Sequence, residues 1–179
     1  MSRIGKQPVS IPAGVDVAID GQSVKVKGPK GELTHTFLDE VTIRQDGDTL
    51  LVERLDDERI ARSVHGLSRT LLSNMLVGVT EQFTKTLELN GVGYRAAKSG
   101  KTLTLTVGKS HPETFEENDD IKIEVPNPNL ILVTGPDKQK VGAFAANLRA
   151  TRPAEPYKGK GLKYEGERIK RKVGKAGKK

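Results

Sequence analysis

In the first half of the chain, apolar and polar residues alternate before the spacing changes to that of a helix. Residues 24–27 read Val-Lys-Val-Lys, and a period of two is typical of a β-strand because successive side chains point to opposite faces. The Gly-Pro-Lys-Gly segment at 28–31 ends that run and predicts a turn. Apolar runs at 41–43 and 50–52 flank Asp-Gly-Asp at 46–48, so we predict two strands joined by a hairpin.

A helix is predicted next. Asp56 is its expected N-cap, and Asp57 and Glu58 would lie in the positively polarised first turn. Spacings of three and four residues separate the members of one apolar stripe: Ile60, Val64, Leu67, Leu71 and Met75. We expect this stripe to pack against the sheet, and Gly78 to lie just past the end of the helix.

The second half of the chain repeats this order. Apolar residues alternate with threonine over 102–107, the clearest strand pattern in the sequence. Further strands are expected from the apolar positions of three segments: 87–89, 121–125 and 130–133. Gly-Pro-Asp at 135–137 then predicts the start of a second helix, with proline at a tolerated first position.

The second helix has its own apolar stripe: Val141, Phe144, Ala145 and Leu148. Arg149 and Arg152 fall in its negatively polarised last turn, and Pro153 is expected to end it. The two halves can also be overlaid, because Ile43 corresponds to Ile123 at an offset of 80 residues. The chain is therefore interpreted as an internal duplication.

This duplication predicts an α+β fold of two small domains, each a mainly antiparallel sheet with one amphipathic helix packed on a face. We expect a first domain with a short N-terminal arm at 1–82, a second domain at 83–153 and a basic tail at 154–179. One sheet shared by both halves is an alternative that the sequence leaves open. Each half has only about 75 residues, so each core is expected to be marginal alone.

The charge is unevenly distributed. Residues 1–156 hold 20 Lys and Arg against 21 Asp and Glu, whereas residues 157–179 hold 10 against 2, so the net charges are −1 and +8. A near-neutral body with a concentrated basic tail indicates a polyanion partner, and a solvated tail without a partner is the alternative. The chain has no cysteine, no N-terminal signal sequence and no apolar run long enough for a membrane span, which favours a cytoplasmic protein.

Two glycine motifs resemble nucleotide-binding sequences but lack the context. Gly-Val-Gly-Tyr-Arg-Ala at 91–96 matches a dinucleotide fingerprint, which requires a helix next, yet a Thr/Leu strand pattern follows. Gly108 to Ser110 resembles the end of a P-loop, but that motif requires a glycine five positions before Gly108, where this chain has Leu103. The histidines at 35, 65 and 111 have no metal-ligand spacing. No cofactor and no metal are expected.

The basic tail carries the strongest chemical signal. Residues 157–164 alternate cations with glycines and are flanked by two tyrosines. Glycine permits close backbone approach, lysine neutralises phosphate, and tyrosine can stack on an unpaired base. Further Lys and Arg residues follow over 168–179. The basic tail has no apolar face of its own, so it is expected to be disordered until a polyanion binds.

Several segments, in order along the chain, carry a family resemblance. They are Ser-Arg-Ile-Gly-Lys-Gln-Pro-Val at 2–9, Val-Lys-Gly-Pro-Lys-Gly-Glu-Leu at 26–33, Gly-Val-Gly-Tyr-Arg-Ala at 91–96, Gly-Lys-Ser-His-Pro at 108–112 and Arg-Pro-Ala-Glu-Pro-Tyr-Lys-Gly-Lys-Gly-Leu-Lys-Tyr at 152–164. Together they resemble the bacterial form of the ribosomal protein L six family, the sixth protein of the large ribosomal subunit. The resemblance covers essentially the whole chain and is most specific over 155–164.

The resemblance implies a structural constituent of the large ribosomal subunit with no catalytic activity. It implies binding to large-subunit ribosomal RNA, mainly through the second domain and the tail, near the elongation-factor site and the stalk base. The implied partners are this RNA, neighbouring ribosomal proteins and nearby translation factors, with no membrane and no small-molecule substrate. The implied location is the cytoplasmic ribosome.

The RNA-binding residues that follow fall into two groups. The main contacts lie in the tail: Tyr157, Lys158, Gly159, Lys160, Gly161, Lys163, Tyr164, Arg168, Lys170, Arg171 and Lys172. Weaker candidates lie in the arm and in two turns of the second domain: Arg3, Lys6, Tyr94, Arg95, Lys109, Ser110 and His111. The chain departs from the family pattern at Ala154, Leu162 and Glu113, and Glu113 weakens the case for phosphate contact at its turn.

Two other classes of function compete with this interpretation. A protein-docking module would present sheet edges to partners and would bind them with little dependence on salt. A nucleotide-binding enzyme would require a helix after Ala96. The first is compatible with a ribosomal role, and the second is nearly excluded by the strand pattern.

Overall fold

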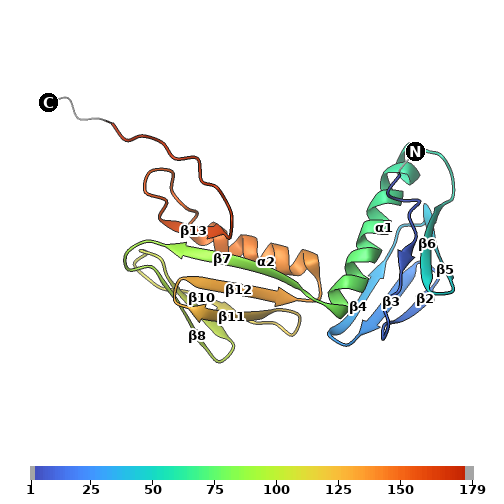
Figure 1. The fold of residues 1–179 in the computed structure, drawn as a ribbon, viewed down its shortest axis with the longest axis horizontal. Coiled ribbons are helices and arrows are strands. Elements are labelled where there is room, and N and C mark those ends of the chain that lie inside the picture. Colours follow the sequence, from blue (N-terminus) through green and yellow to red (C-terminus); the bar gives the residue numbers. More distant parts are fainter. Residues whose placement is uncertain (1–2, 176–179) are drawn as a thin grey trace. The chain divides into compact units, whose positions relative to one another are not determined.

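A computed structural model describes residues 3–175 of the chain. The chain forms two compact units (Figure 1). Unit 1 consists of Met1–Phe83 with Pro136–Lys138, and unit 2 of Thr84–Gly135 with Gln139–Lys179. Each unit has its own buried apolar cluster.

Unit 1 is built from antiparallel hairpins. Its strands are β1 (Val9–Ser10), β2 (Asp16–Asp20), β3 (Ser23–Gly28), β4 (Gly31–Thr36), β5 (Val41–Asp46) and β6 (Thr49–Arg54). In one sheet β6 lies between β1 and β5, and in the other β3 lies between β2 and β4. Val24 and Val26 of β3 are buried while the intervening lysines are exposed, which confirms the predicted alternation. The predicted turns at 28–31 and 46–48 are also present.

The helix of unit 1, α1 (Arg59–Thr80), packs on these strands, but not as the sequence predicted. Asp56 is not the N-cap, because Glu58 holds that position and its N–H donates to Asp56 Oδ1 at 3.0 Å. None of the predicted acidic residues lies in the first turn. Gly78 is a buried residue inside the helix rather than a residue beyond its end, since the helix continues to Thr80.

The predicted apolar stripe of α1 is also partly wrong. Ile60 and Leu67 are 57% and 55% exposed. The face that is buried combines large and small residues: Ala61, Val64, His65, Ser68, Leu72, Met75, Leu76, Gly78 and Val79. Small residues contribute little to a hydrophobic pattern but allow the sheet to approach the helix closely. The stripe of large residues therefore predicted a face that is rotated about the helix axis from the face that is buried.

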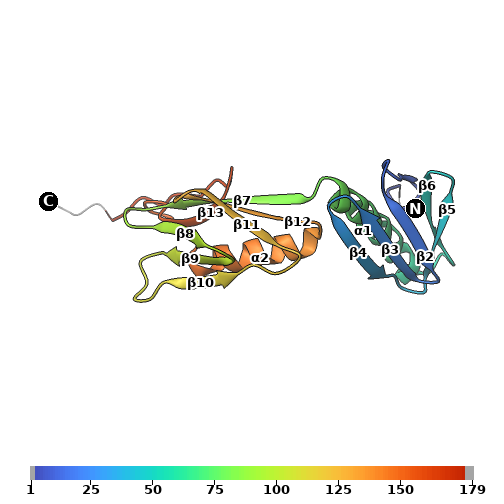
Figure 2. The ribbon, with the colours of Figure 1, turned by 90° about the horizontal axis from the view of Figure 1, so that it is seen from below.

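Unit 2 contains the remaining elements. They are β7 (Phe83–Asn90), β8 (Arg95–Ser99), β9 (Thr102–Thr106), β10 (Glu113–Glu116), β11 (Lys122–Asn127), β12 (Leu130–Gly135), α2 (Lys138–Thr151) and β13 (Gly161–Tyr164). One sheet has the order β11-β12-β7-β13 and the other the order β10-β9-β8. Figure 2 shows α2 lying along the strands of this unit. The helix buries Val141, Ala145 and Leu148, which confirms its predicted stripe.

The start of α2 differs slightly from the prediction. The helix begins at Lys138, so Pro136 and Asp137 precede it instead of forming its first turn. Its end agrees in part with the prediction, because Thr151 is the last helical residue, Arg149 lies in the last turn and Pro153 follows. Arg152 was also expected in the last turn but lies just beyond the helix. Both units therefore combine antiparallel hairpins with one packed helix, and the predicted α+β class is confirmed.

Part of the basic tail belongs to the sheet of unit 2. Residues 161–164 form β13, which pairs antiparallel with β7, and Leu162 faces Leu89 in this register. The Leu162 side chain is fully buried in the core of the unit. The expectation that the tail is disordered without a partner is therefore wrong for residues 161–164, because the burial of Leu162 and the pairing with β7 order them. Residues 176–179 of the tail lie outside the described residues.

Candidate nucleic-acid interface

The loop that precedes β13 is closed by the side chain of Glu155. Glu155 Oε2 accepts a hydrogen bond from the Tyr157 N–H at 2.7 Å, and Oε1 accepts one from the Lys158 N–H at 2.6 Å. The Glu155 N–H donates in turn to the Lys160 carbonyl at 2.9 Å. These bonds fix the backbone of residues 155–160, from which the lysine side chains project into solvent.

Two glycines allow the chain to follow this path. Gly159 has φ +74° and Gly161 has φ +132°, both in the region that side chains rarely adopt. A Cβ on Gly161 would also lie 2.6 Å from the Pro153 carbonyl oxygen and 2.7 Å from the Ala154 Cα. Gly161 therefore permits β13 to pass directly beside the segment that follows α2.

The residues after β13 fold back onto the same loop. The Lys172 N–H donates to the Pro156 carbonyl at 2.9 Å, and the Arg171 guanidinium lies beside Gly159. Glu167 anchors this segment further along, since it accepts from Arg149 of α2 at 2.5 and 3.0 Å and from the Tyr164 N–H at 2.9 Å. The segment up to Lys172 is thus attached to unit 2 at both ends.

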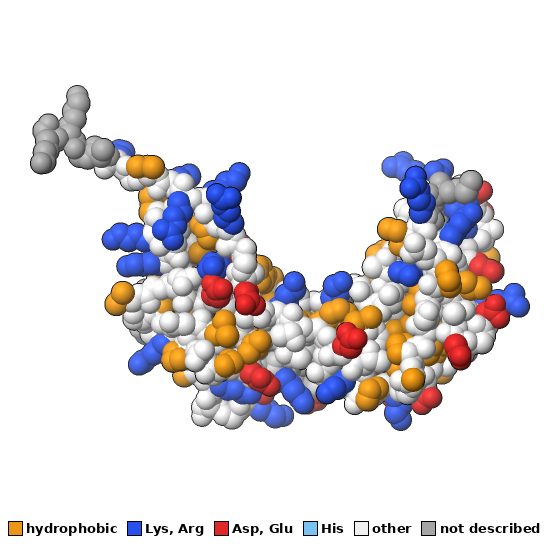
Figure 3. Space-filling model, viewed as in Figure 1, with side chains coloured by type: hydrophobic (Ala, Val, Ile, Leu, Met, Phe, Trp, Pro, Cys, Tyr) orange, Lys and Arg blue, Asp and Glu red, His pale blue; other side chains and the backbone are white. Residues whose placement is uncertain are grey.

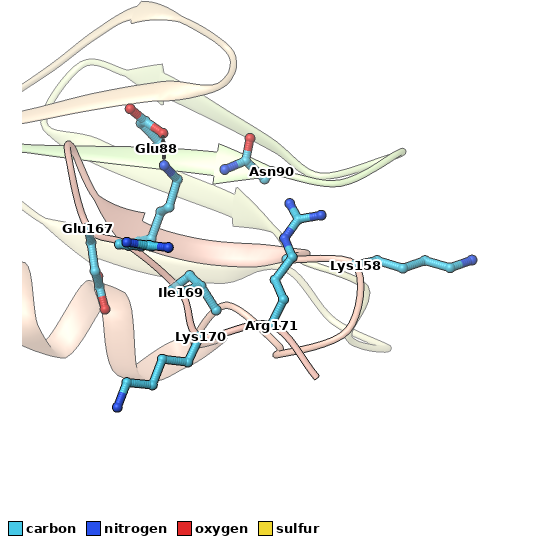
Figure 4. Close-up of a pocket in the computed structure, with 10 residues that line it drawn as sticks. Glu88, Asn90, Lys158, Glu167, Ile169, Lys170 and Arg171 are labelled. Carbon is cyan, nitrogen blue, oxygen red and sulfur yellow. Dashed lines mark ion pairs between the residues drawn. The ribbon is translucent and has the colours of Figure 1, made fainter. Parts of the chain in front are cut away.

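An open groove lies between this segment and β7. It has a volume of about 1340 Å³ and is lined by Glu88, Asn90, Lys158, Gly159, Lys163, Glu167, Arg168, Ile169, Lys170 and Arg171. Figure 4 shows Arg171 directed toward Asn90, while Lys158 and Lys170 extend outward. Small-molecule sites are mostly apolar and about 300–1,000 Å³ in volume, so this larger charged groove suits a polyanion better.

The cations of the predicted site divide into exposed and paired groups. The exposed ones are Lys158, Lys160, Arg168, Lys170, Arg171 and Lys172. Lys163 instead forms an ion pair with Glu88 at 2.6 Å, and its side chain is only 22% exposed. Figure 3 shows Lys and Arg side chains gathered over the C-terminal part of unit 2.

The two tyrosines of the segment 157–164 also differ in exposure. Tyr157 is 56% exposed. Tyr164 packs against the core, with the Arg149 guanidinium 5.7 Å from its ring centre. A ring that is occupied by its own protein is less available to a nucleotide base, so Tyr157 is the better stacking candidate.

Two further turns of unit 2 meet at Tyr94. Its ring lies against Gly91 and Gly108, where an added Cβ would approach it to 3.1 Å on either glycine. Arg95, which follows Tyr94, is exposed, and so are Ser110 and His111 of the turn that begins at Gly108. Lys109 pairs with Glu113 at 2.8 Å, so that turn presents less positive charge than its sequence suggests.

The N-terminal arm belongs to unit 1. Gly5 lies against the buried His65 ring, and Arg69 of α1 donates to the carbonyls of Gln7 and Pro8 at 3.3 and 3.4 Å. Arg3 and Lys6, the candidates of this arm, are exposed on the surface of unit 1.

Hydrogen bonding keeps the carboxylates of the interface ionised. Backbone N–H groups, that of Tyr157 first, lower the pKa of Glu155. The hydrogen bonds from Arg149 and from the Tyr164 N–H lower the pKa of Glu167. The hydrogen bond to Glu167 in turn raises the pKa of Arg149. These acidic residues hold the loop and the segment in place, so the basic surface depends on carboxylates within it.

Comparison with known proteins identifies the family. The family model "Ribosomal protein L6" matches residues 11–82 and 90–165. The chain belongs to this family. Relatives named large ribosomal subunit protein uL6 include that of Pelotomaculum thermopropionicum, with 58% identity over 99% of this chain and 97% of the relative. Those of Moorella thermoacetica and Rubrobacter xylanophilus are 59% and 55% identical over 99% of this chain, and over 97% and 100% of their own length.

This is a structural family rather than an enzyme family, and the observed fold agrees with the exclusion of a nucleotide site. The strand β8 follows Gly91 and Gly93, where a dinucleotide-binding motif requires a helix. Among residues 3–175, no cluster of His, Asp and Glu could hold a metal ion. In the same range, no helix has the length and apolar character to cross a membrane.

Sequence reasoning missed the acidic and neutral members of the interface. Glu88, Asn90 and Ile169 line the groove, while Glu155, Glu167 and Arg149 position its parts. The signal for Glu155 was its place at the start of a short glycine-containing loop. No local pattern relates Glu88 to Lys163 or Glu167 to Arg149, because these pairs form only when strands and helix pack.

Proposed function

We propose that this ribosomal protein is a structural constituent of the large subunit that binds large-subunit ribosomal RNA mainly through unit 2. Its relatives are named as a large ribosomal subunit protein, and the match covers 97% of their length. The proposed contact is the surface formed by the 155–160 loop and residues 168–172, near the elongation-factor site and the stalk base. Neighbouring ribosomal proteins, and translation factors that bind nearby, complete the proposed set of partners.

The exposed cations on an ordered scaffold are the observation that carries this proposal. Lys158 and Lys160 project from a loop fixed by Glu155, and Arg171 is held beside Gly159. Lys and Arg side chains neutralise phosphates, and such contacts set the position of a protein on RNA without reading sequence. Because the scaffold is already ordered, binding requires less loss of backbone entropy than an unfolded tail would.

Tyr157 adds a candidate contact to bases. It lies in the same loop, between the carboxylate that fixes the backbone and the exposed Lys158. An exposed aromatic ring beside cations can stack on an unpaired base, which contributes roughly 1–3 kcal/mol in single-stranded complexes. The loop thus combines phosphate neutralisation with stacking.

Binding to large-subunit ribosomal RNA across a salt series tests this function. We expect Lys158→Glu with Lys160→Glu to abolish specific binding and incorporation into the subunit. The matched control is Lys101→Glu with Lys122→Glu, which changes the net charge equally on exposed residues of the same unit. If both double variants lose affinity equally, only overall charge matters and this surface is not the contact.

Truncation at Pro153 is a poorer test than charge reversal. It would remove Leu162 from the core and β13 from the sheet, so loss of binding would follow from unfolding alone.

A protein-docking module remains the second candidate. It would show partner binding that changes little with salt and with the lysine reversals.

A further inference from the structure

The carboxylate of Glu155 occupies a position where backbone N–H groups converge. It accepts from the N–H groups of Tyr157 at 2.7 Å and Lys158 at 2.6 Å, with the Lys160 N–H further away at 3.4 Å. Successive backbone N–H groups that point into one concavity form an anion-binding nest. Here the anion in the nest is a side chain of the same chain.

We infer that Glu155 is a positioning residue for RNA binding: its carboxylate fills the nest and holds the loop so that Lys158 and Lys160 face the polyanion. This inference rests on the proposed function. The negative charge of Glu155 lies within a basic surface and by itself repels RNA. In this inference its net effect on RNA binding is favourable, because it orders the loop. RNA phosphate is excluded from the nest and meets the lysine side chains instead.

The loop has few other constraints that could replace Glu155. Its backbone is closed by the bonds of Glu155 N–H to the Lys160 carbonyl at 2.9 Å and of Gly159 N–H to the Glu155 carbonyl at 3.1 Å. Gly159 itself has φ +74°, so the loop turns at its most flexible residue. Within residues 3–175, the Glu155 carboxylate is the charged group that accepts from the N–H groups of this turn.

The same loop supports the cations that follow β13. The Pro156 carbonyl accepts from the Lys172 N–H at 2.9 Å, and Arg171 lies beside Gly159. A change in the loop would thus displace both groups of exposed cations. The backbone N–H groups of the nest, that of Tyr157 first, lower the pKa of Glu155 and so favour its ionised form.

Simple electrostatics and positioning make opposite predictions for this residue. Removing a negative charge beside a polyanion should strengthen binding if charge alone matters. Removing the group that orders the loop should weaken binding, because the loop must then be ordered when RNA binds. The neutral variant Glu155→Gln separates the two.

The test measures binding of full-length variants to large-subunit ribosomal RNA over a range of salt concentrations. The control is Glu165→Gln, which removes the same charge from an exposed residue close in sequence. We expect Glu155→Gln to weaken binding roughly tenfold while Glu165→Gln binds as well as or better than the unmodified protein. The slope of log K against log salt should stay unchanged in Glu155→Gln, whereas Lys158→Gln should reduce it by about 0.7–0.9.

Hydrogen exchange of the Tyr157 and Lys158 amides gives a readout that does not depend on RNA. Faster exchange at these amides in Glu155→Gln, with an unchanged melting temperature of unit 2, supports the positioning role. Unchanged exchange, or binding as tight as in Glu165→Gln, overturns it. If Lys158→Gln and Lys160→Gln bind RNA with normal affinity, the proposed RNA contact of the loop is refuted. If these lysine variants bind RNA weakly while Glu155→Gln binds with normal affinity, only the proposed role of Glu155 is refuted.

Discussion

Lys163 of β13 and Glu88 of β7 lie opposite each other in the sheet, and their side chains form an ion pair of 2.6 Å. The pair lines the groove, so a lysine of the most basic motif is partly neutralised by its own protein. Charge in the sequence therefore overstates the charge that this position offers to RNA.

We expect Lys163→Gln to weaken RNA binding less than Lys160→Gln, since Lys160 is exposed whereas Lys163 is paired with Glu88. A pair this close to the surface contributes about 0–1 kcal/mol to folding, so neither variant should unfold the protein. Affinity and salt slope, measured for both variants, check this expectation. Equal losses would mean that RNA displaces Glu88 from the pair.

Replacing Gly161 with alanine should destabilise unit 2. The new Cβ would lie 2.6–2.7 Å from backbone atoms at 152–154, and φ +132° is strained for any side chain. We expect a loss of about 2–4 kcal/mol in the free energy of unfolding, measured with urea. Gly166→Ala is the control, because its φ is +74° with open space around it, and it should cost only about 1–2 kcal/mol.

Leu162→Ala tests whether the basic motif is part of the folded core. Leu162 is fully buried, and truncation of a buried leucine costs about 2–5 kcal/mol. We expect the loss of stability to be accompanied by loss of RNA binding at temperatures where unit 2 melts. Val173→Ala, at a residue that is 97% exposed, should change neither quantity. A stable Leu162→Ala protein would contradict the packing of β13.

The Arg149–Glu167 pair predicts how stability depends on pH. The pKa of Glu167 is lowered in the folded protein, so its stabilising effect is complete above the ordinary value of 4.5 and is lost as pH falls through the lowered folded value. Glu167→Gln should therefore reduce stability at neutral pH and make the decline below pH 4.5 shallower.

Urea unfolding at a series of pH values measures this dependence. Glu165→Gln serves as the control, because Glu165 is exposed and close in sequence. If Glu167→Gln retained the acid dependence of the unmodified protein, another carboxylate would be responsible. Glu155, whose pKa is also lowered, would be the next residue to examine.

Sequence analysis succeeded where the pattern is local. Strands with strict alternation, such as 102–106, and the hairpin at 46–48 are read from neighbouring residues, and the structure confirms them. It failed for α1 because the buried face uses Ala61, Ser68 and Gly78, whose side chains carry little hydrophobic signal. The same weakness hid β13, where one buried leucine stands among glycines and lysines.

By itself, the sequence determined the α+β class, the internal repetition, the family and the cationic segment, because each is written in residue spacing or composition. The tertiary structure decided which of those cations reach solvent. Strand pairing brings Glu88 to Lys163, whose side chain is only 22% exposed, whereas Lys158 and Lys160 stay exposed on a loop tied by Glu155. Packing makes this choice because an ion pair depends on distances between side chains, and those distances exist only after the strands have paired.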